Sequence, residues 1–159
     1  MKAKANPKKT LAYVASVAIA LAVGGLSAIV NAGKFEMSGL VQPPLSPPPW
    51  LFPIVWTVLF ALMGVSAARV FLRGGNGAGD ALFVYATQLV VNFLWTVFYF
   101  NFGALLLSFF WLLFRIALVA LMIVRFERVC SGAGTLIIPY AIWLLFAAYL
   151  NLATYLLNR

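Results

Sequence analysis

The chain has 159 residues, of which 65% are hydrophobic and only 9% are charged, with a formal net charge of +8 and a mean hydropathy of +1.03. A soluble domain of this size has too little interior for so much apolar surface, so the composition predicts an integral membrane protein that has the lipid bilayer as its solvent. One Cys, no His and three acidic residues exclude a disulfide, a His-based metal site or triad, and an acid–base carboxylate pair.

The first apolar run, 11–30, follows a basic start made of Lys2, Lys4, Lys8 and Lys9. Such a start also describes a secretory signal peptide that would be cleaved, and Val30-Asn31-Ala32 loosely resembles a cleavage site. Because the run has about 20 residues, the length that spans a bilayer, we expect a retained helix. Small residues recur at every fourth position, a stripe that lets another helix approach closely, either within the bundle or in a dimer: Ser16, Ala20, Gly24 and Ala28.

The connection that follows ends in the proline-rich segment 42–49, which cannot be helical and favours extended polyproline geometry. Four further spans are expected, at about 50–70, 81–100, 104–126 and 135–157. Asp80 is the expected N-cap of the third span. The sequence therefore predicts an all-α membrane protein, a five-transmembrane-helix bundle that forms a single domain over residues 1–159.

Basic residues outside the spans are distributed unequally between the two sides of this bundle. The side of the N-terminus carries eight of them, and the opposite side carries only Lys34 and Arg159. By the positive-inside rule this predicts a cytoplasmic N-terminus, with the long first loop and the C-terminus outside. The same bias accounts for the positive net charge without nucleic acid as a partner. The eight residues are Lys2, Lys4, Lys8, Lys9, Arg69, Arg73, Arg125 and Arg128.

Polar residues in the third span share one helix face, because Gln88, Asn92 and Trp95 are spaced i, i+4 and i+7. In a membrane helix an amide pair is costly unless it meets protein, water or a ligand, so this face is expected to look inward. Asn92 could equally bridge two helices. For Trp50, at the first residue of a span, interfacial anchoring is nearly as well supported as ligand contact.

Arg115 lies near the middle of the fourth span, a position at which a charge is expensive and usually functional. No acidic residue falls inside any expected span, so the sequence shows no ion-pair partner for it. Two interpretations remain open. The guanidinium is satisfied by carbonyls, water or a snorkelling path, or it pairs with a carboxylate of a ligand.

Three motifs occur in order along these spans. They are Pro-Pro-Leu-Ser-Pro-Pro-Pro-Trp-(x5)-Trp, which enters the second span, Gln-Leu-x-x-Asn-x-x-Trp in the third, and Pro-Tyr-x-x-Trp-x-x-Phe-Ala-x-x-Leu-Asn in the fifth. With them the chain resembles, over roughly 38–158, the TspO/MBR family of translocator proteins, also called tryptophan-rich sensory proteins or peripheral-type benzodiazepine receptors. One departure is Leu45, where members of the family usually carry Trp.

The resemblance implies a five-helix bundle, usually a homodimer, whose pocket opens toward the long first loop, which acts as a lid. It implies a receptor or transporter-like protein that needs no cofactor and binds tetrapyrroles such as protoporphyrin IX, sterol-like molecules in some organisms, and synthetic ligands. A bacterial cytoplasmic membrane is the expected location. Carried over by motif, the ligand-binding positions are Trp50, Trp56, Gln88, Asn92, Trp95, Tyr140, Trp143, Ala147 and Leu150.

Two alternatives to a binding protein remain. In the first, the protein is a light-dependent porphyrin-degrading enzyme that uses Trp56, Trp95 and Trp143 as redox-active partners of the excited ligand. In the second, it is a proton- or ion-coupled exporter, an interpretation weakened by the lack of Asp, Glu or His within the spans.

Overall fold

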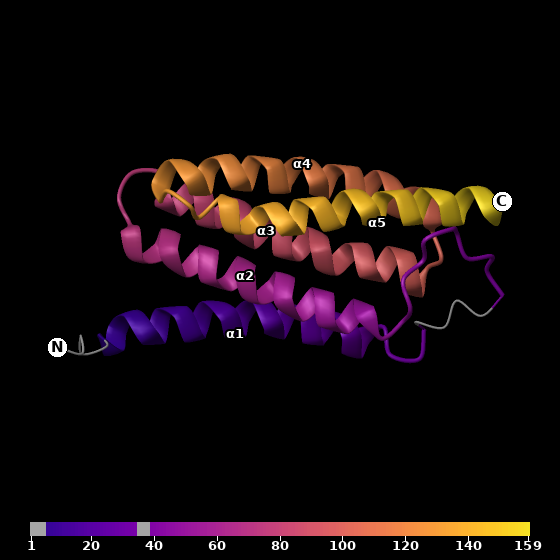
Figure 1. Cartoon of the computed structure of the whole chain (residues 1–159), viewed down its shortest axis with the longest axis horizontal. Helices are drawn as coiled ribbons and strands as arrows, with labels where there is room; N and C mark the ends of the chain where they lie inside the picture. Colours follow the sequence, from indigo (N-terminus) through magenta and orange to yellow (C-terminus); the bar gives the residue numbers. More distant parts are fainter. Residues whose placement is uncertain (1–5, 35–38) are drawn as a thin grey trace.

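The computed structural model describes residues 6–34 and 39–159, so Lys2, Lys4 and Glu36 lie outside the described residues. Within these ranges five long helices alternate in direction, and the two termini lie at opposite ends of the molecule (Figure 1). Each helix, with the short turns attached to it, is long and apolar enough to cross a membrane. The predicted all-helical, five-span architecture is confirmed. The helices are α1 (Pro7–Val30), α2 (Leu51–Arg73), α3 (Ala78–Thr96), α4 (Leu105–Val129) and α5 (Ile138–Leu157).

The helix ends differ from the expected spans by a few residues, for local reasons. Helix α1 begins at Pro7 because the Asn6 side chain accepts a hydrogen bond from the Lys8 N–H and Pro suits the first helical position. The prediction that Asp80 caps α3 is wrong. Gly77, in the left-handed conformation at φ 83°, precedes the helix. Asp80 lies in the first turn instead, where a carboxylate favours the positive end of the helix dipole.

Short non-α turns adjoin two helices. A π-helical turn (Val97–Asn101) extends α3, and a 3-10 turn (Thr135–Ile137) leads into α5. At the π-helical turn, the Asn101 side chain donates to Asn31, and Asn31 in turn donates to the Thr96 hydroxyl (2.9 Å). Asn31 is fully buried, although it belongs to the segment that resembles a cleavage site. The end of α1 is therefore bonded into the bundle, which favours a retained helix.

Helices α1 and α2 cross closely because glycines stand at the contact. A Cβ on Gly64 would lie 2.5 Å from the Val17 Cα, and one on Gly24 would lie 2.6 Å from the Phe60 ring. Ala20 is fully buried, whereas Ala28 is exposed. The small-residue stripe of α1 thus packs within the bundle at Ala20 and Gly24.

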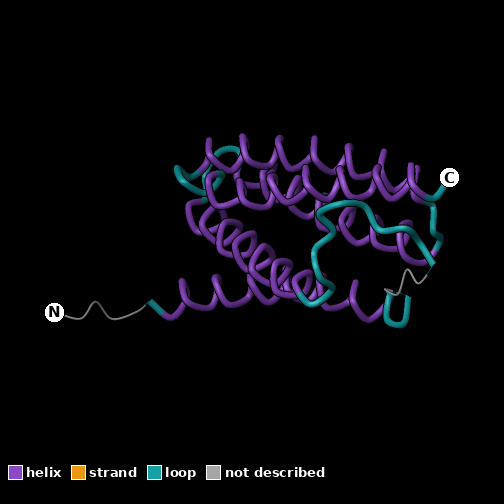
Figure 2. Tube along the Cα trace, turned by 45° about the vertical axis from the view of Figure 1, so that its right-hand side comes forward, coloured by secondary structure: helices purple, strands orange, loops and turns teal. Residues whose placement is uncertain are grey.

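The proline-rich segment is non-helical, as predicted, and crosses the end of the bundle beside the C-terminus (Figure 2). The Asn158 side chain accepts from the Val41 N–H (2.8 Å) and donates to the Val41 carbonyl (3.0 Å). The Tyr149 hydroxyl donates to the Pro44 carbonyl (2.9 Å). These bonds fasten the loop to α5. Leu45 lies at its tip with a φ of 66° and 78% of its surface exposed.

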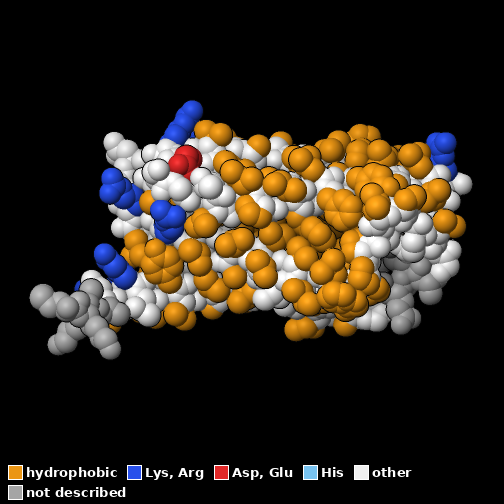
Figure 3. Space-filling model, in the orientation of Figure 1, with side chains coloured by type: hydrophobic (Ala, Val, Ile, Leu, Met, Phe, Trp, Pro, Cys, Tyr) orange, Lys and Arg blue, Asp and Glu red, His pale blue; other side chains and the backbone are white. Residues whose placement is uncertain are grey.

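On the face seen in Figure 3, charged side chains gather at the two ends, and the surface between them is mainly hydrophobic. Most of the Lys and Arg residues on this face lie at the end that carries the N-terminus. This arrangement is typical of a membrane protein, because charges remain in the aqueous and headgroup regions while the apolar sides face lipid.

Candidate functional site

The polar face of α3 points into the bundle. The exposed fractions of Gln88, Asn92 and Trp95 are 0%, 2% and 9%. Val90, on the opposite face of the helix, is 58% exposed. The inward orientation expected from their spacing is confirmed. Amide groups are therefore buried at the depth at which the other helices contribute aromatic rings.

A fully buried arginine from α4 meets this face. The Arg115 Nε and Nη2 atoms donate to the Tyr140 hydroxyl at 3.0 Å and 2.7 Å, and the Gln88 amide is hydrogen-bonded to the same hydroxyl. Tyr140 belongs to α5, so one oxygen joins side chains of three helices. With two lone pairs, that hydroxyl cannot satisfy every donor directed at it.

Aromatic rings surround the guanidinium. The Arg115 Cζ atom lies 5.1 Å from the centroid of Trp56, 5.4 Å from that of Tyr140 and 5.8 Å from that of Trp95. Trp56 and Tyr140 also pack edge to face at 6.2 Å. Cation–π contacts partly compensate a buried cation, but they supply no acceptor for its N–H groups. We call the set Trp56, Gln88, Asn92, Trp95, Arg115 and Tyr140 the central cluster.

The central cluster holds more hydrogen-bond donors than acceptors. Among the described residues, three buried donor atoms of the cluster have no partner: Asn92 Nδ2, Trp95 Nε1 and Arg115 Nη1. The Trp143 Nε1 atom of α5 is also buried and unpaired. Among the described residues, the one fully buried acceptor of the cluster without a partner is Gln88 Oε1. Unpaired buried donors are costly, so this site suits a group that brings acceptor oxygens.

The other motif positions differ in burial and in their contacts. Trp143 packs edge to face on Phe52 of α2, with ring centroids 5.9 Å apart. Trp143 and Ala147 are both partly buried and pack against the hydrophobic core of the bundle. Leu150 is partly exposed. Trp50 is 65% exposed at the start of α2, a placement that favours an interfacial anchor over a cluster contact.

Sequence reasoning did not single out Phe52, the ring partner of Trp143. Its position four residues before Trp56 puts the two on one face of α2, which is the signal that could have found it. The described residues contain no group of three His, Cys, Asp or Glu side chains that could hold a metal ion. The chemistry of the cluster is therefore that of aromatic faces, amides and one guanidinium.

Comparison with known protein families matches residues 14–156 to the TspO/MBR family, a range that begins within α1 and includes the whole central cluster. The chain belongs to the TspO/MBR family. It is 32% identical over 151 residues to the tryptophan-rich protein TspO of Chlorobaculum tepidum, covering 94% of this chain and 96% of that protein. It is 37% identical over 156 residues to the protein CrtK of Rhodobacter capsulatus, covering 94% and 93%. It is 31% identical over 117 residues to the translocator protein of Ovis aries, covering 72% and 69%.

Membership of the TspO/MBR family gives the three motifs a common structural setting. The amides of the third-span motif and the tyrosine of the fifth-span motif meet in the central cluster, and the proline-rich motif forms the loop above α5. At the tip of that loop, Leu45 is exposed and makes no ring contact of the kind that the usual Trp could make. The loop therefore presents an aliphatic side chain, and no indole, at this position.

Proposed function

We propose that this TspO/MBR protein is a membrane receptor or transporter-like protein that binds tetrapyrroles, such as protoporphyrin IX, and related flat hydrophobic ligands in the central cluster. The observation that carries the proposal is the fully buried Arg115, which has aromatic rings around it and no carboxylate partner among the described residues. Flat conjugated ligands stack favourably on indole faces. A few fixed polar groups then set their orientation in an apolar site.

The charge of Arg115 points to an anionic group on the ligand. A guanidinium stays protonated in proteins, and a buried charge without a counter-ion is strongly unfavourable. A propionate carboxylate of a porphyrin would neutralise it and accept from the unpaired Nη1 atom. The remaining unpaired donors of the cluster could then bind the second carboxylate oxygen or the ring nitrogens.

The decisive experiment compares protoporphyrin IX with its dimethyl ester, which keeps the ring and lacks the carboxylates. Quenching of tryptophan fluorescence in the purified full chain reports the affinity. We expect the wild type to bind the acid at least tenfold more tightly than the ester, because a buried charge pair contributes about 2 kcal/mol or more. In Arg115→Met, the acid and the ester should bind alike.

Arg125→Met serves as the matched control, because it removes a cation at the end of the bundle while leaving the cluster intact. It should keep the preference for the acid. Equal affinity of the wild type for acid and ester would show that Arg115 does not bind the carboxylate. Failure of the wild type to bind either compound would reject the tetrapyrrole proposal itself.

The alternative enzymatic function has one observation in its favour. Trp56 and Trp95 both flank the guanidinium, so a ligand bound there would touch two indoles that could exchange electrons with it in light. Illumination of the porphyrin complex separates the two functions. Loss of ligand absorbance with a new product band, abolished by Trp56→Phe or Trp95→Phe, supports an enzyme. An unchanged spectrum supports binding alone.

Orientation and assembly complete the proposal. We propose a bacterial cytoplasmic membrane as the location, with the basic end of the bundle in the cytoplasm and the proline-rich loop and C-terminus outside, supported by the charge bias. Ligands would then enter from the loop side.

We also propose a homodimer, on the basis of the family resemblance. Since Ala20 and Gly24 pack against α2, other surfaces would have to form the dimer contact.

A further inference from the structure

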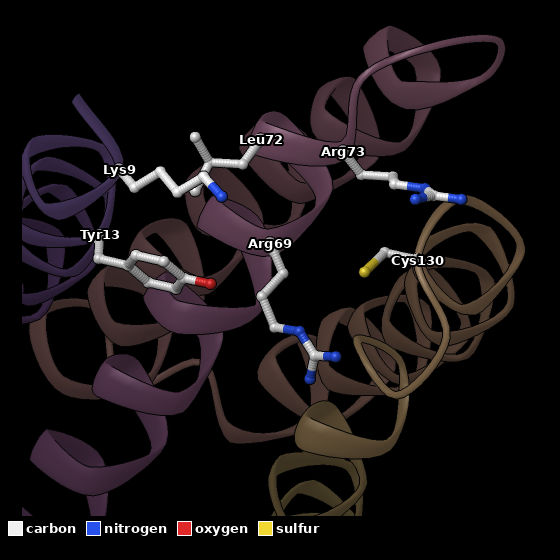
Figure 4. Close-up of a pocket in the computed structure, with 6 residues that line it drawn as sticks. All are labelled: Lys9, Tyr13, Arg69, Leu72, Arg73 and Cys130. Atoms are coloured by element: carbon white, nitrogen blue, oxygen red, sulfur yellow. The ribbon is translucent and has the colours of Figure 1, made fainter. Parts of the chain in front are cut away.

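A separate pocket of about 220 Å³ lies at the basic end of the bundle, between α1, α2 and the turn that joins α4 to α5 (Figure 4). In Figure 4 the Lys9 amine and the Tyr13 hydroxyl point toward the Arg69 side chain from one side, the Cys130 thiol points toward it from the other, and the Arg73 guanidinium extends past Cys130. We call this site the basic pocket. Its lining residues are Lys9, Tyr13, Arg69, Leu72, Arg73 and Cys130.

The basic pocket has three cations in its lining and no acidic side chain. The two acidic side chains at this end of the described chain have other partners, although Glu127 binds the same α4–α5 turn as Arg69. Asp80 lies 4.0 Å from Arg125, and the Glu127 carboxylate accepts from the N–H groups of Gly132 (2.7 Å) and Gly134 (3.0 Å). Three like charges around one space repel one another, and an anion placed between them removes that repulsion.

The guanidinium of Arg69 is fixed in place, whereas the other two cations are free to close on a ligand. Its Nη1 and Nη2 atoms donate to the carbonyls of Gly132 (3.2 Å) and Ser131 (2.9 Å), which ties α2 to the α4–α5 turn. Among the described residues, the Lys9 and Arg73 side chains have no hydrogen-bond or ion-pair partner. Arg69 therefore supplies a preorganised charge, and Lys9 and Arg73 supply donors.

The depth of the basic pocket matches that of lipid headgroups. Lys9 lies in the first turn of α1 and Arg73 in the last turn of α2, at the end where the hydrophobic sides of the bundle give way to charge (Figure 3). Tyr13 and Leu72 add apolar contacts, and the neighbouring Phe71 is 62% exposed on the outer surface. Basic pockets between membrane helices at this depth suit anionic headgroups, while the acyl chains follow the apolar surface.

We propose that the basic pocket binds the phosphate of an anionic glycerophospholipid from the leaflet at the N-terminal end of the bundle. The bound lipid contacts Lys9 of α1 and both Arg69 and Arg73 of α2. Arg69 also binds the backbone of the α4–α5 turn, so the lipid is linked to that turn through Arg69. This site is distinct from the central cluster, because the two share no lining residue. The proposal does not depend on tetrapyrrole binding.

Native mass spectrometry of the full chain in neutral detergent tests the site. Phosphatidylglycerol and phosphatidylcholine with identical acyl chains are titrated, and we expect the anionic lipid to bind at least tenfold more tightly. Since each basic residue near an anionic headgroup contributes about fivefold, Lys9→Gln/Arg73→Gln should lower phosphatidylglycerol affinity about 25-fold. The control Lys34→Gln/Arg159→Gln removes the same charge at the opposite end and should leave it unchanged. Equal binding of the two lipids, or an equal loss in the control, would overturn the proposal.

Cys130, the one cysteine of the sequence, reports occupancy of the basic pocket and distinguishes a lipid from a free phosphate. We expect phosphatidylglycerol to slow labelling of Cys130 by a neutral maleimide at least fivefold in the wild type and not in Lys9→Gln/Arg73→Gln. Inorganic phosphate and glycerol phosphate at the same concentration should not protect the thiol. Equal protection by free phosphate would overturn the assignment to a lipid, and no protection by the lipid would overturn the site.

Discussion

Arg115 is the residue whose surroundings are least expected in a membrane protein of this composition. Its guanidinium is fully buried, it donates only to the neutral Tyr140 hydroxyl, and its other contacts are ring faces. Such an arrangement destabilises the ligand-free protein, because neither the hydroxyl nor the rings replace the solvation that the charge has lost. A residue that is costly without ligand and complementary to an anion is typical of a binding site.

The first prediction at this scale concerns stability without ligand. Arg115→Met replaces the buried charge with an apolar side chain of similar length and leaves Tyr140 bonded to Gln88. We expect the free energy of unfolding to be unchanged or to rise by up to about 4 kcal/mol, since apolar replacement of buried charges is often neutral or stabilising. Thermal unfolding in detergent measures it. A fall in the midpoint of several degrees would mean that Arg115 serves the fold.

A second prediction concerns the acceptor of Arg115. Tyr140→Phe removes the oxygen that receives Nε and Nη2, so both donors of a buried cation lose their partner. We expect a loss of about 1–3 kcal/mol in the free energy of unfolding. In the Arg115→Met background the same change should cost much less, because no charged donor remains. Equal costs in the two backgrounds would contradict the coupling of these residues.

At the scale of the helices, the fold depends on the close crossing of α1 and α2. Gly64 faces the backbone of α1 at Val17, and no flexible side chain lies between them that could move aside. Gly24 faces the Phe60 ring, which can rotate or shift more easily. In lipid, helices associate through van der Waals packing and hydrogen bonds. The close packing at Gly64 and Gly24 therefore stabilises the association of α1 with the rest of the bundle.

Gly64→Ala tests this crossing. The added methyl group would lie 2.5 Å from the Val17 Cα, so α1 must move away, and we expect a loss of about 1–3 kcal/mol from overpacking. Gly25→Ala is the matched control, because its Cβ meets nothing within 4 Å. Thermal unfolding should separate the two variants. Similar midpoints for both would show that α1 adjusts at no cost.

On the scale of the whole molecule, charge is segregated along the bundle axis. Eight basic residues belong to one end of the sequence-predicted bundle and two to the other. The basic pocket and the loop fastened to α5 lie at opposite ends of this axis, so the proposed lipid site and the proposed ligand entrance face different sides of the membrane. By the positive-inside rule, the bias predicts that the lipid site faces the cytoplasm and the ligand entrance faces the outside.

Reporter fusions after Arg159 test the orientation in a bacterial host. We expect an alkaline phosphatase fused there to be active, since it folds outside the cytoplasm, and a green fluorescent protein fused there to be dark. Exchanging the cations Lys8, Lys9, Arg69 and Arg73 for Gln should reduce the bias and give a mixed topology. A fluorescent fusion on the unaltered chain would reverse the proposed orientation.

Features that depend on one helix and its solvent were predictable from the sequence. Hydropathy defined five spans, a spacing of i, i+4 and i+7 showed which face of α3 is buried, and proline content excluded a helix before α2. The ordered motifs were sufficient to identify the family. Each of these follows from local chemistry: apolar length against bilayer thickness, helix periodicity, and the missing N–H of proline.

The contacts between helices could not be predicted from the sequence and were found in the folded bundle. The meeting of Arg115 with Tyr140, Gln88 and two indoles depends on the rotation and crossing of four helices, and no single span encodes those quantities. The same holds for Gly64 against Val17 and for the convergence of Lys9, Arg69 and Arg73 on one pocket. Helix rotation and tilt in a membrane are set by packing against neighbours, because lipid accepts every apolar face alike.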